Sequence, residues 1–104
     1  MGYDWSIFYG LHSAIMRQSI DSEPAGGWFP EEKLSAEETI RGYTVNASYA
    51  NFTEESTGKL VEGMWADITV LDTDVFADVR EDPASLLAGK VLMTIVNGEI
   101  VYQQ

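Results

Sequence analysis

The sequence predicts an α+β fold in which two helices precede a small β-sheet with an Asn-Gly hairpin near the C-terminus. Three observations favour it: apolar residues at helical spacing early in the chain, a helix-capping signal at Ser35, and two β-branched runs joined by Asn97 and Gly98. The chain has 104 residues, of which 45% are hydrophobic. That length and composition suit one small domain with a folded core.

The first predicted helix spans residues 4–19. Its buried stripe recurs at helical spacing and consists of Ile7, Phe8, Leu11, Ile15 and Met16. Asp4 lies where a first-turn anion stabilises a helix. The helix ends before residues 22–27, which are rich in glycine and proline and predict a loop. Trp28 and Phe29 follow, and two aromatics in a loop need a surface to lie on.

The second predicted helix spans residues 35–47. Ser35 and Glu38 have the spacing of a capping box, in which each side chain accepts a hydrogen bond from the other residue's backbone N–H. We expect its buried face to contain Ile40, Tyr43, Thr44 and Ala47. Gly42 lies inside this helix at a cost of up to about 1 kcal/mol relative to alanine, which suggests close packing against a neighbour.

The second half of the chain predicts roughly four short strands. Residues 60–63 read as a strand and turn, residues 65–71 as a strand, and residues 83–88 as one helical turn. The clearest local signal is the pair of runs at 91–96 and 100–102, because the Asn-Gly between them is preferred in type I′ hairpin turns.

Charge and residue types exclude several classes of function. With 17 acidic and 6 basic residues the formal net charge is −11, so nucleic acids and anionic membranes would be repelled. There is no cysteine and one histidine, His12, which excludes thiolate chemistry and any site that needs two histidines. The longest apolar run is too short for a membrane span, and no secretory signal is visible, so we expect a cytoplasmic protein.

Two groups of side chains invite a functional interpretation, and neither is supported. A lone histidine on a helix is usually a packed or solvent-facing side chain, and we expect His12 to be a peripheral helix residue. Asp72, Asp74 and Asp78 resemble the start of a calcium loop. Its fifth, sixth and twelfth positions would then be Phe76, Ala77 and Pro83, none of which fits, so a solvated loop is the better interpretation.

Adjacent carboxylates occur three times, at Glu31-Glu32, Glu37-Glu38 and Glu54-Glu55. Neighbouring side chains point in different directions and do not converge on one substrate atom. Glu37 and Glu38 have a simpler role as anions in the first turn of a helix. From the residues alone we assign no catalytic, metal-binding or cofactor-binding residue.

Five stretches in order resemble the amidohydrolase superfamily, in the branch called amidohydrolase family three. They are Gly10 to Gln18, Gly27 to Ser35, Thr44-Val45-Asn46-Ala47, Gly58-Lys59-Leu60 through Gly63 to Ala66-Asp67 and its apolar strand, and Val96-Asn97-Gly98-Glu99-Ile100-Val101. Together they run from about Ile7 to Tyr102, which is nearly the whole chain.

The resemblance implies that this chain is the C-terminal part of a larger fold. Residues 1–52 would match the last outer helices of a (β/α)8 barrel, and residues 53–104 would form part of a small β-sandwich, the two together making one compact unit. The family holds one or two divalent metal ions, typically zinc, on histidines, a carboxylated lysine or glutamate, and an aspartate. All of these would lie upstream of position 1. Asp67 would open a strand and is not expected to be catalytic.

The leading hypothesis is therefore the C-terminal portion of a metal-dependent hydrolase of non-peptide C–N bonds, inactive by itself and without a cofactor of its own. The alternatives are a free-standing binding or assembly module derived from an amidohydrolase tail, and a subunit that completes a split barrel. In each case we expect a homodimer or binding to the missing barrel portion, since helix faces and strand edges would otherwise stay exposed.

Overall fold

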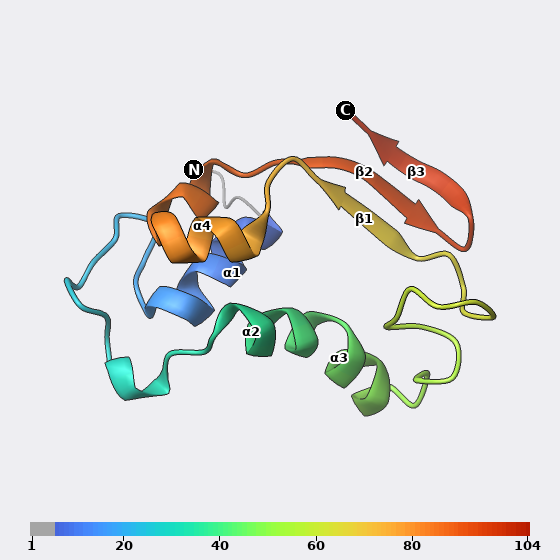
Figure 1. Ribbon diagram of the computed structural model, residues 1–104, viewed down its shortest axis with the longest axis horizontal. Coiled ribbons are helices and arrows are strands. Elements are labelled where there is room, and N and C mark those ends of the chain that lie inside the picture. The colour runs from blue at the N-terminus through green and yellow to red at the C-terminus, as the bar shows by residue number, and fades with distance from the viewer. Residues whose placement is uncertain (1–5) are drawn as a thin grey trace, which may run out of the picture. The chain divides into compact units, whose positions relative to one another are not determined.

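The computed structural model describes residues 6–104 and has an α+β fold, as predicted (Figure 1). The described chain divides into two compact units. Unit 1 contains residues 6–39 and 73–90, and unit 2 contains residues 40–72 and 91–104. The expected boundary between residues 52 and 53 stays a prediction.

Helix α1 (Ile7–Met16) forms the centre of unit 1. The Ser6 hydroxyl accepts a hydrogen bond from the Phe8 N–H at 3.2 Å and caps its first turn. The helix ends at Arg17, which has left-handed backbone angles (φ 56°, ψ 40°) and donates its N–H to the Ser13 carbonyl. The helix is thus shorter than the predicted 4–19, because this closure stops it one residue after Met16. Asp4 lies outside the described residues.

The core of unit 1 lies where α1 packs on the 3-10 helix η2 (Pro83–Ala88). Phe8, Leu11 and Ile15 of the predicted stripe are buried, whereas Ile7 and Met16 are only half-buried. Leu86 of η2 is buried as well. Gly89, the residue after η2, lies against the Phe8 ring: a β-carbon at this position would be 2.5 Å from the ring atoms. The predicted helical turn at 83–88 is confirmed.

Helix α4 (Val75–Glu81) packs on η2 and was not predicted. The Asp74 carboxylate accepts hydrogen bonds from the N–H groups of Phe76 and Ala77, which caps the helix. Val75 is buried. The solvated loop expected around Asp72, Asp74 and Asp78 is therefore wrong for residues 75–81, because a capped helix satisfies their backbone groups.

The capping box of the second predicted helix is confirmed. In α2 (Ala36–Tyr43) the Ser35 N–H donates to Glu38 Oε1 at 2.9 Å, and the Glu38 N–H donates to Ser35 Oγ at 3.1 Å. A short 3-10 helix, η1 (Pro30–Glu32), precedes it.

The predicted single helix over 35–47 is wrong beyond Tyr43. Thr44 leaves helical geometry (φ −118°, ψ −89°), and a separate helix, α3 (Val45–Ala50), follows. The expected buried face is also wrong: Tyr43, Thr44 and Ala47 are exposed, whereas the buried residues of α2 and α3 are Ala36, Thr39 and Ser48. A β-carbon at Gly42 would meet no described atom within 4 Å apart from its chain neighbours and the backbone of its own helix, so the expected close packing is not found.

Hydroxyl groups tie the end of α3 to the turn that follows it in unit 2. Ser48 Oγ lies 2.7 Å from Thr57 Oγ1, which also donates to Thr53. Gly58 follows with φ of 96°, and a β-carbon there would lie 2.6 Å from Ser48 Oγ. Only glycine tolerates both this backbone conformation and this approach.

Unit 2 contains a three-stranded antiparallel sheet in the order β1 (Ile68–Leu71), β2 (Val91–Val96) and β3 (Glu99–Gln103) (Figure 1). The predicted hairpin is confirmed, with φ of 50° at Asn97 and 80° at Gly98, as a type I′ turn requires. Of the strand and turn expected at 60–63, the strand is wrong and the turn is present, closed by the Met64 N–H donating to the Val61 carbonyl.

Across residues 6–104, no helix is long and apolar enough to cross a membrane.

Candidate functional site

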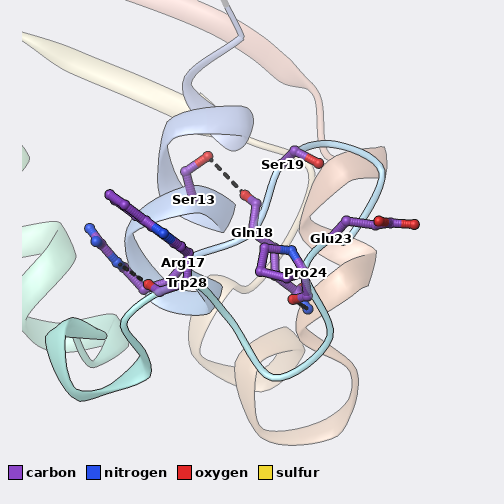
Figure 2. A pocket seen from close by; sticks show the side chains of 7 residues that line it. All are labelled: Ser13, Arg17, Gln18, Ser19, Glu23, Pro24 and Trp28. Carbon is purple, nitrogen blue, oxygen red and sulfur yellow. Dashed lines mark hydrogen bonds between the residues drawn. The ribbon is translucent and has the colours of Figure 1, made fainter.

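A shallow hollow in unit 1 is lined by one loop and the end of α1 (Figure 2). Its volume is about 270 Å³, and its walls are Ser13, Arg17, Gln18, Ser19, Glu23, Pro24 and Trp28. All of these residues come from a single stretch of chain. The hollow is therefore the concave side of the loop that follows α1.

Hydrogen bonds within this loop use most of the polar groups that line the hollow. The Gln18 side-chain amide donates to the Pro24 carbonyl at 3.0 Å, and the Ser13 hydroxyl donates to the Gln18 carbonyl at 3.4 Å. The Ser19 N–H donates to the Glu23 carbonyl at 2.9 Å. These groups hold the loop in shape.

Arg17 joins the two ends of the loop through both its backbone and its side chain. Its carbonyl accepts the Trp28 N–H at 2.8 Å, and its Nε donates to the Trp28 carbonyl at 2.9 Å (Figure 2). The guanidinium carbon lies 5.3 Å from the centre of the Trp28 ring, a cation–π arrangement. The Trp28 and Phe29 rings meet edge to face with their centroids 4.6 Å apart, yet Trp28 remains 62% exposed. The two aromatic rings therefore pack against each other, and the Trp28 ring also packs against Arg17.

Within residues 6–104, the side chains that line the hollow include no nucleophile paired with a base. Among the described residues that line the hollow, the serines have no histidine base beside them, and Arg17 and Glu23 are the only charged side chains. Nucleophilic catalysis needs a base within hydrogen-bond reach of the hydroxyl. The hollow is a structural feature of the loop.

His12 is fully buried in unit 1, at 0% exposure, and so is not the peripheral residue that we expected. It lies beside Leu11 on the face of α1 that forms the core. Within the described part of the chain, neither Nδ1 nor Nε2 has a hydrogen-bond partner. Burial lowers the pKa of the imidazole below its usual 6.5, because the charged form cannot be solvated. A fully enclosed ring of this kind is out of reach of a substrate.

The structure does not bring the acidic pairs together into a site. Glu31 and Glu32 lie on η1, Glu37 and Glu38 lie in the first turn of α2, and Glu54 and Glu55 lie in a turn after α3. Hydrogen bonds from the backbone and the side chain of Ser35 lower the pKa of the Glu38 carboxyl. That carboxylate serves the helix cap.

Sequence reasoning missed the contact that Asp67 makes. Its Oδ1 accepts a hydrogen bond from the Asn97 N–H at 2.7 Å, across 30 positions of the chain. The neighbouring Ala66 carbonyl accepts the Gly98 N–H at 3.0 Å. Ala66 and Asp67 belong to one stretch of the family resemblance, and Asn97 and Gly98 belong to another. The occurrence of both stretches in one chain was the sequence signal that could have predicted this contact.

Among residues 6–104, no group of three or more histidine, cysteine, aspartate or glutamate side chains is placed to hold a metal ion. The metal that the family resemblance implies therefore has no fitting set of ligands in this part of the chain.

Comparison with known proteins identifies relatives much longer than this chain. The chain is 37% identical over 95 residues to the amidohydrolase-type protein YtcJ of Bacillus subtilis, covering 91% of this chain and 17% of that protein. It is 28% identical over 94 residues to the N-substituted formamide deformylase of Arthrobacter pascens, covering 90% and 16%. It is 37% identical over 70 residues to the imidazolonepropionase of Photobacterium profundum, covering 67% and 16%.

No solved structure matches the chain. The chain spans only about one sixth of the length of these curated relatives. The model of the amidohydrolase family, in the branch expected from the sequence motifs, matches residues 6–102. The chain therefore belongs to the amidohydrolase family.

Proposed function

We propose that this chain is the C-terminal scaffold portion of a larger amidohydrolase that hydrolyses C–N bonds of non-peptide amides, and that it is inactive by itself. Its length, about one sixth of each relative, supports a role as one portion of such an enzyme. The similarity to an N-substituted formamide deformylase supports amide substrates for the larger protein.

The observation that carries this proposal is the exposed apolar surface of unit 2. Successive residues of a strand point to opposite faces of a sheet. Cross-strand partners share a face, and β3 pairs Ile100 with Ile95 and Tyr102 with Thr94, with Val101 as the extra residue between them. Because Ile95 and Thr94 are successive on β2, Ile100 and Tyr102 lie on opposite faces. Ile100 is 56% exposed and Tyr102 is 49% exposed, so large hydrophobic side chains on both faces contact water. Large exposed apolar patches are typical of surfaces that contact a further part of the protein or a partner. In the proposed enzyme, the remainder of the polypeptide covers this sheet.

The described residues contribute structure to that enzyme and no step of catalysis. The metal of the larger protein would supply an activated water for hydrolysis. No residue described here fits its ligand set, since the chain has one histidine, and that histidine is enclosed in a core. We therefore assign no catalytic role to any residue of this chain.

The test is an amidase assay of the chain alone, in the presence of zinc, with the Arthrobacter pascens deformylase as positive control and an N-substituted formamide as substrate. We expect no turnover above that of buffer and less than stoichiometric zinc after dialysis. Turnover, or stoichiometric zinc that is lost in His12→Ala, would overturn the proposal.

Without its remaining polypeptide, the chain is proposed to cover its exposed sheet by pairing with a second copy. Two-fold pairing is the commonest way for identical chains to bury such a surface. The net charge of −11 opposes pairing only modestly, because salt screens exposed charges beyond about 8 Å at physiological ionic strength. The cytoplasmic location expected from the sequence stays a prediction.

A further inference from the structure

The turn between β2 and β3 is held closed by two hydrogen bonds to the segment before β1. The Asn97 N–H donates to Asp67 Oδ1 at 2.7 Å, and the Gly98 N–H donates to the Ala66 carbonyl at 3.0 Å. We call this pair of hydrogen bonds the latch. It lies entirely within unit 2, and its chemistry does not depend on the proposed function.

An asparagine followed by glycine has its own covalent chemistry. The Gly98 backbone nitrogen can attack Asn97 Cγ, because glycine has no β-carbon to shield it. A Cγ–N bond then forms, the Cγ–Nδ2 bond breaks, and Nδ2 leaves as ammonia with the proton of the Gly98 N–H. Water hydrolyses the resulting cyclic imide at either carbonyl, which gives aspartate or isoaspartate at position 97.

The latch opposes this reaction at its first step. The attacking nitrogen must give up its proton and turn toward Cγ, yet in the latch its N–H points to the Ala66 carbonyl. The bond to Asp67 also helps to fix the Asn97 backbone at φ of 50°. Asn97 and Gly98 are both exposed, so water has access to them. Geometry, and not burial, is what protects this asparagine.

We propose that Asn97 is a deamidation site under the control of the latch, slow to react while the latch is closed and fast once it opens. Either product carries a carboxylate where Asn97 was neutral, close to the carboxylate of Asp67, and like charges repel. Isoaspartate also adds a carbon to the backbone, which a two-residue type I′ turn does not accommodate. The reaction therefore modifies irreversibly those chains in which the β2–β3 hairpin has separated from the segment before β1.

The test follows deamidation of the peptide containing Asn97 by mass spectrometry. The wild-type chain is incubated in native buffer and in urea, and Asp67→Ala is compared with Asp21→Ala, which removes the same charge from an exposed loop of unit 1. Losing a hydrogen bond to a charged group raises the open population by about tenfold, so we expect Asp67→Ala to deamidate about tenfold faster than wild type. Asp21→Ala should match wild type, and urea should give the fastest rate.

Asn46 and Asn51 are exposed asparagines without a following glycine, and they serve as internal controls in every sample. If Asp67→Ala fails to fold, Asp67→Asn keeps an acceptor oxygen and should react at a rate between those of wild type and urea-unfolded chain. Equal rates for wild type in native buffer and in urea would overturn the proposal. A rate in folded Asp67→Ala no faster than wild type would overturn it as well.

Discussion

At the scale of single residues, His12 makes unit 1 sensitive to acid. Burial lowers the pKa of its imidazole below 6.5, so between that pH and the lowered pKa the unfolded chain binds more protons than the folded one. The free energy of unfolding of unit 1 therefore has its full value above pH 6.5 and decreases as the pH falls from 6.5 toward the lowered pKa of His12. Neither α1 nor η2, which packs on it, carries a carboxylate that could stabilise the imidazolium.

Two substitutions of His12 distinguish the effect of its protonation on stability from the effect of its volume. The measurement is hydrogen-exchange protection of the α1 amides. His12→Leu fills the space without a polar atom, so it should keep or raise protection at neutral pH and remove the loss below pH 6.5. His12→Ala leaves a cavity and should cost about 2–4 kcal/mol. An acid-side loss in His12→Leu as large as that of wild type would contradict the assignment.

At the scale of elements, the capping box stabilises the first turn of α2. Ser35→Ala removes the hydroxyl that accepts the Glu38 N–H, and we expect protection of the first α2 amides to fall about fivefold. Ser35→Thr retains a hydroxyl and should largely restore protection. Equal protection in wild type and Ser35→Ala would show that packing alone sets the start of this helix.

The same box gives α2 a dependence on pH. Hydrogen bonds from Ser35 lower the pKa of Glu38 below 4.5, so their stabilising effect is present above that pH and is lost as the pH falls through the lowered value. Glu38→Gln keeps the accepting oxygen without titrating. Its α2 amides should lose less protection in acid than those of wild type.

Three elements specified by local chemistry were predicted from the sequence, whereas other elements were not. The Ser35 cap, the Asn97-Gly98 turn and the helical turn at 83–88 depend on neighbouring residues, and the structure contains all three. The sequence carries no proline or other breaker for the break at Thr44, and residues 60–63 close as a local turn in which Gly63 has φ of 91°. Helix α4 had a local signal, the Asp74 cap, which a comparison with calcium loops obscured.

The expectation that this chain holds no metal ligands rests on residue counts and stays a prediction. One histidine and no cysteine already excluded the ligand set of the family. The enclosure of His12 and the bond from Asn97 to Asp67 could not be predicted, because each depends on tertiary packing between segments far apart in the sequence. The Arg17 closure of the loop depends likewise on the return of the chain at Trp28.

At the scale of the whole molecule, the two units differ in how they are stabilised. Unit 1 encloses Phe8, Leu11 and Leu86 completely, whereas across residues 40–72 and 91–104, which the structure describes in full, the polar Ser48 is the only buried residue. The sheet of unit 2 therefore exposes its apolar side chains, and the edge strand β3 has no proline or lysine to discourage pairing. Such a surface is what a portion of a larger enzyme would show in isolation.

The most direct test of this account is the mass of the isolated chain in solution. Size-exclusion chromatography with light scattering at tens of micromolar measures whether the exposed sheet finds a partner. We expect roughly twice the monomer mass of 11.5 kDa, because a second copy covers the sheet. A clean 11.5 kDa monomer across that concentration range would contradict the account, since it would show that the apolar surface of unit 2 needs no other chain.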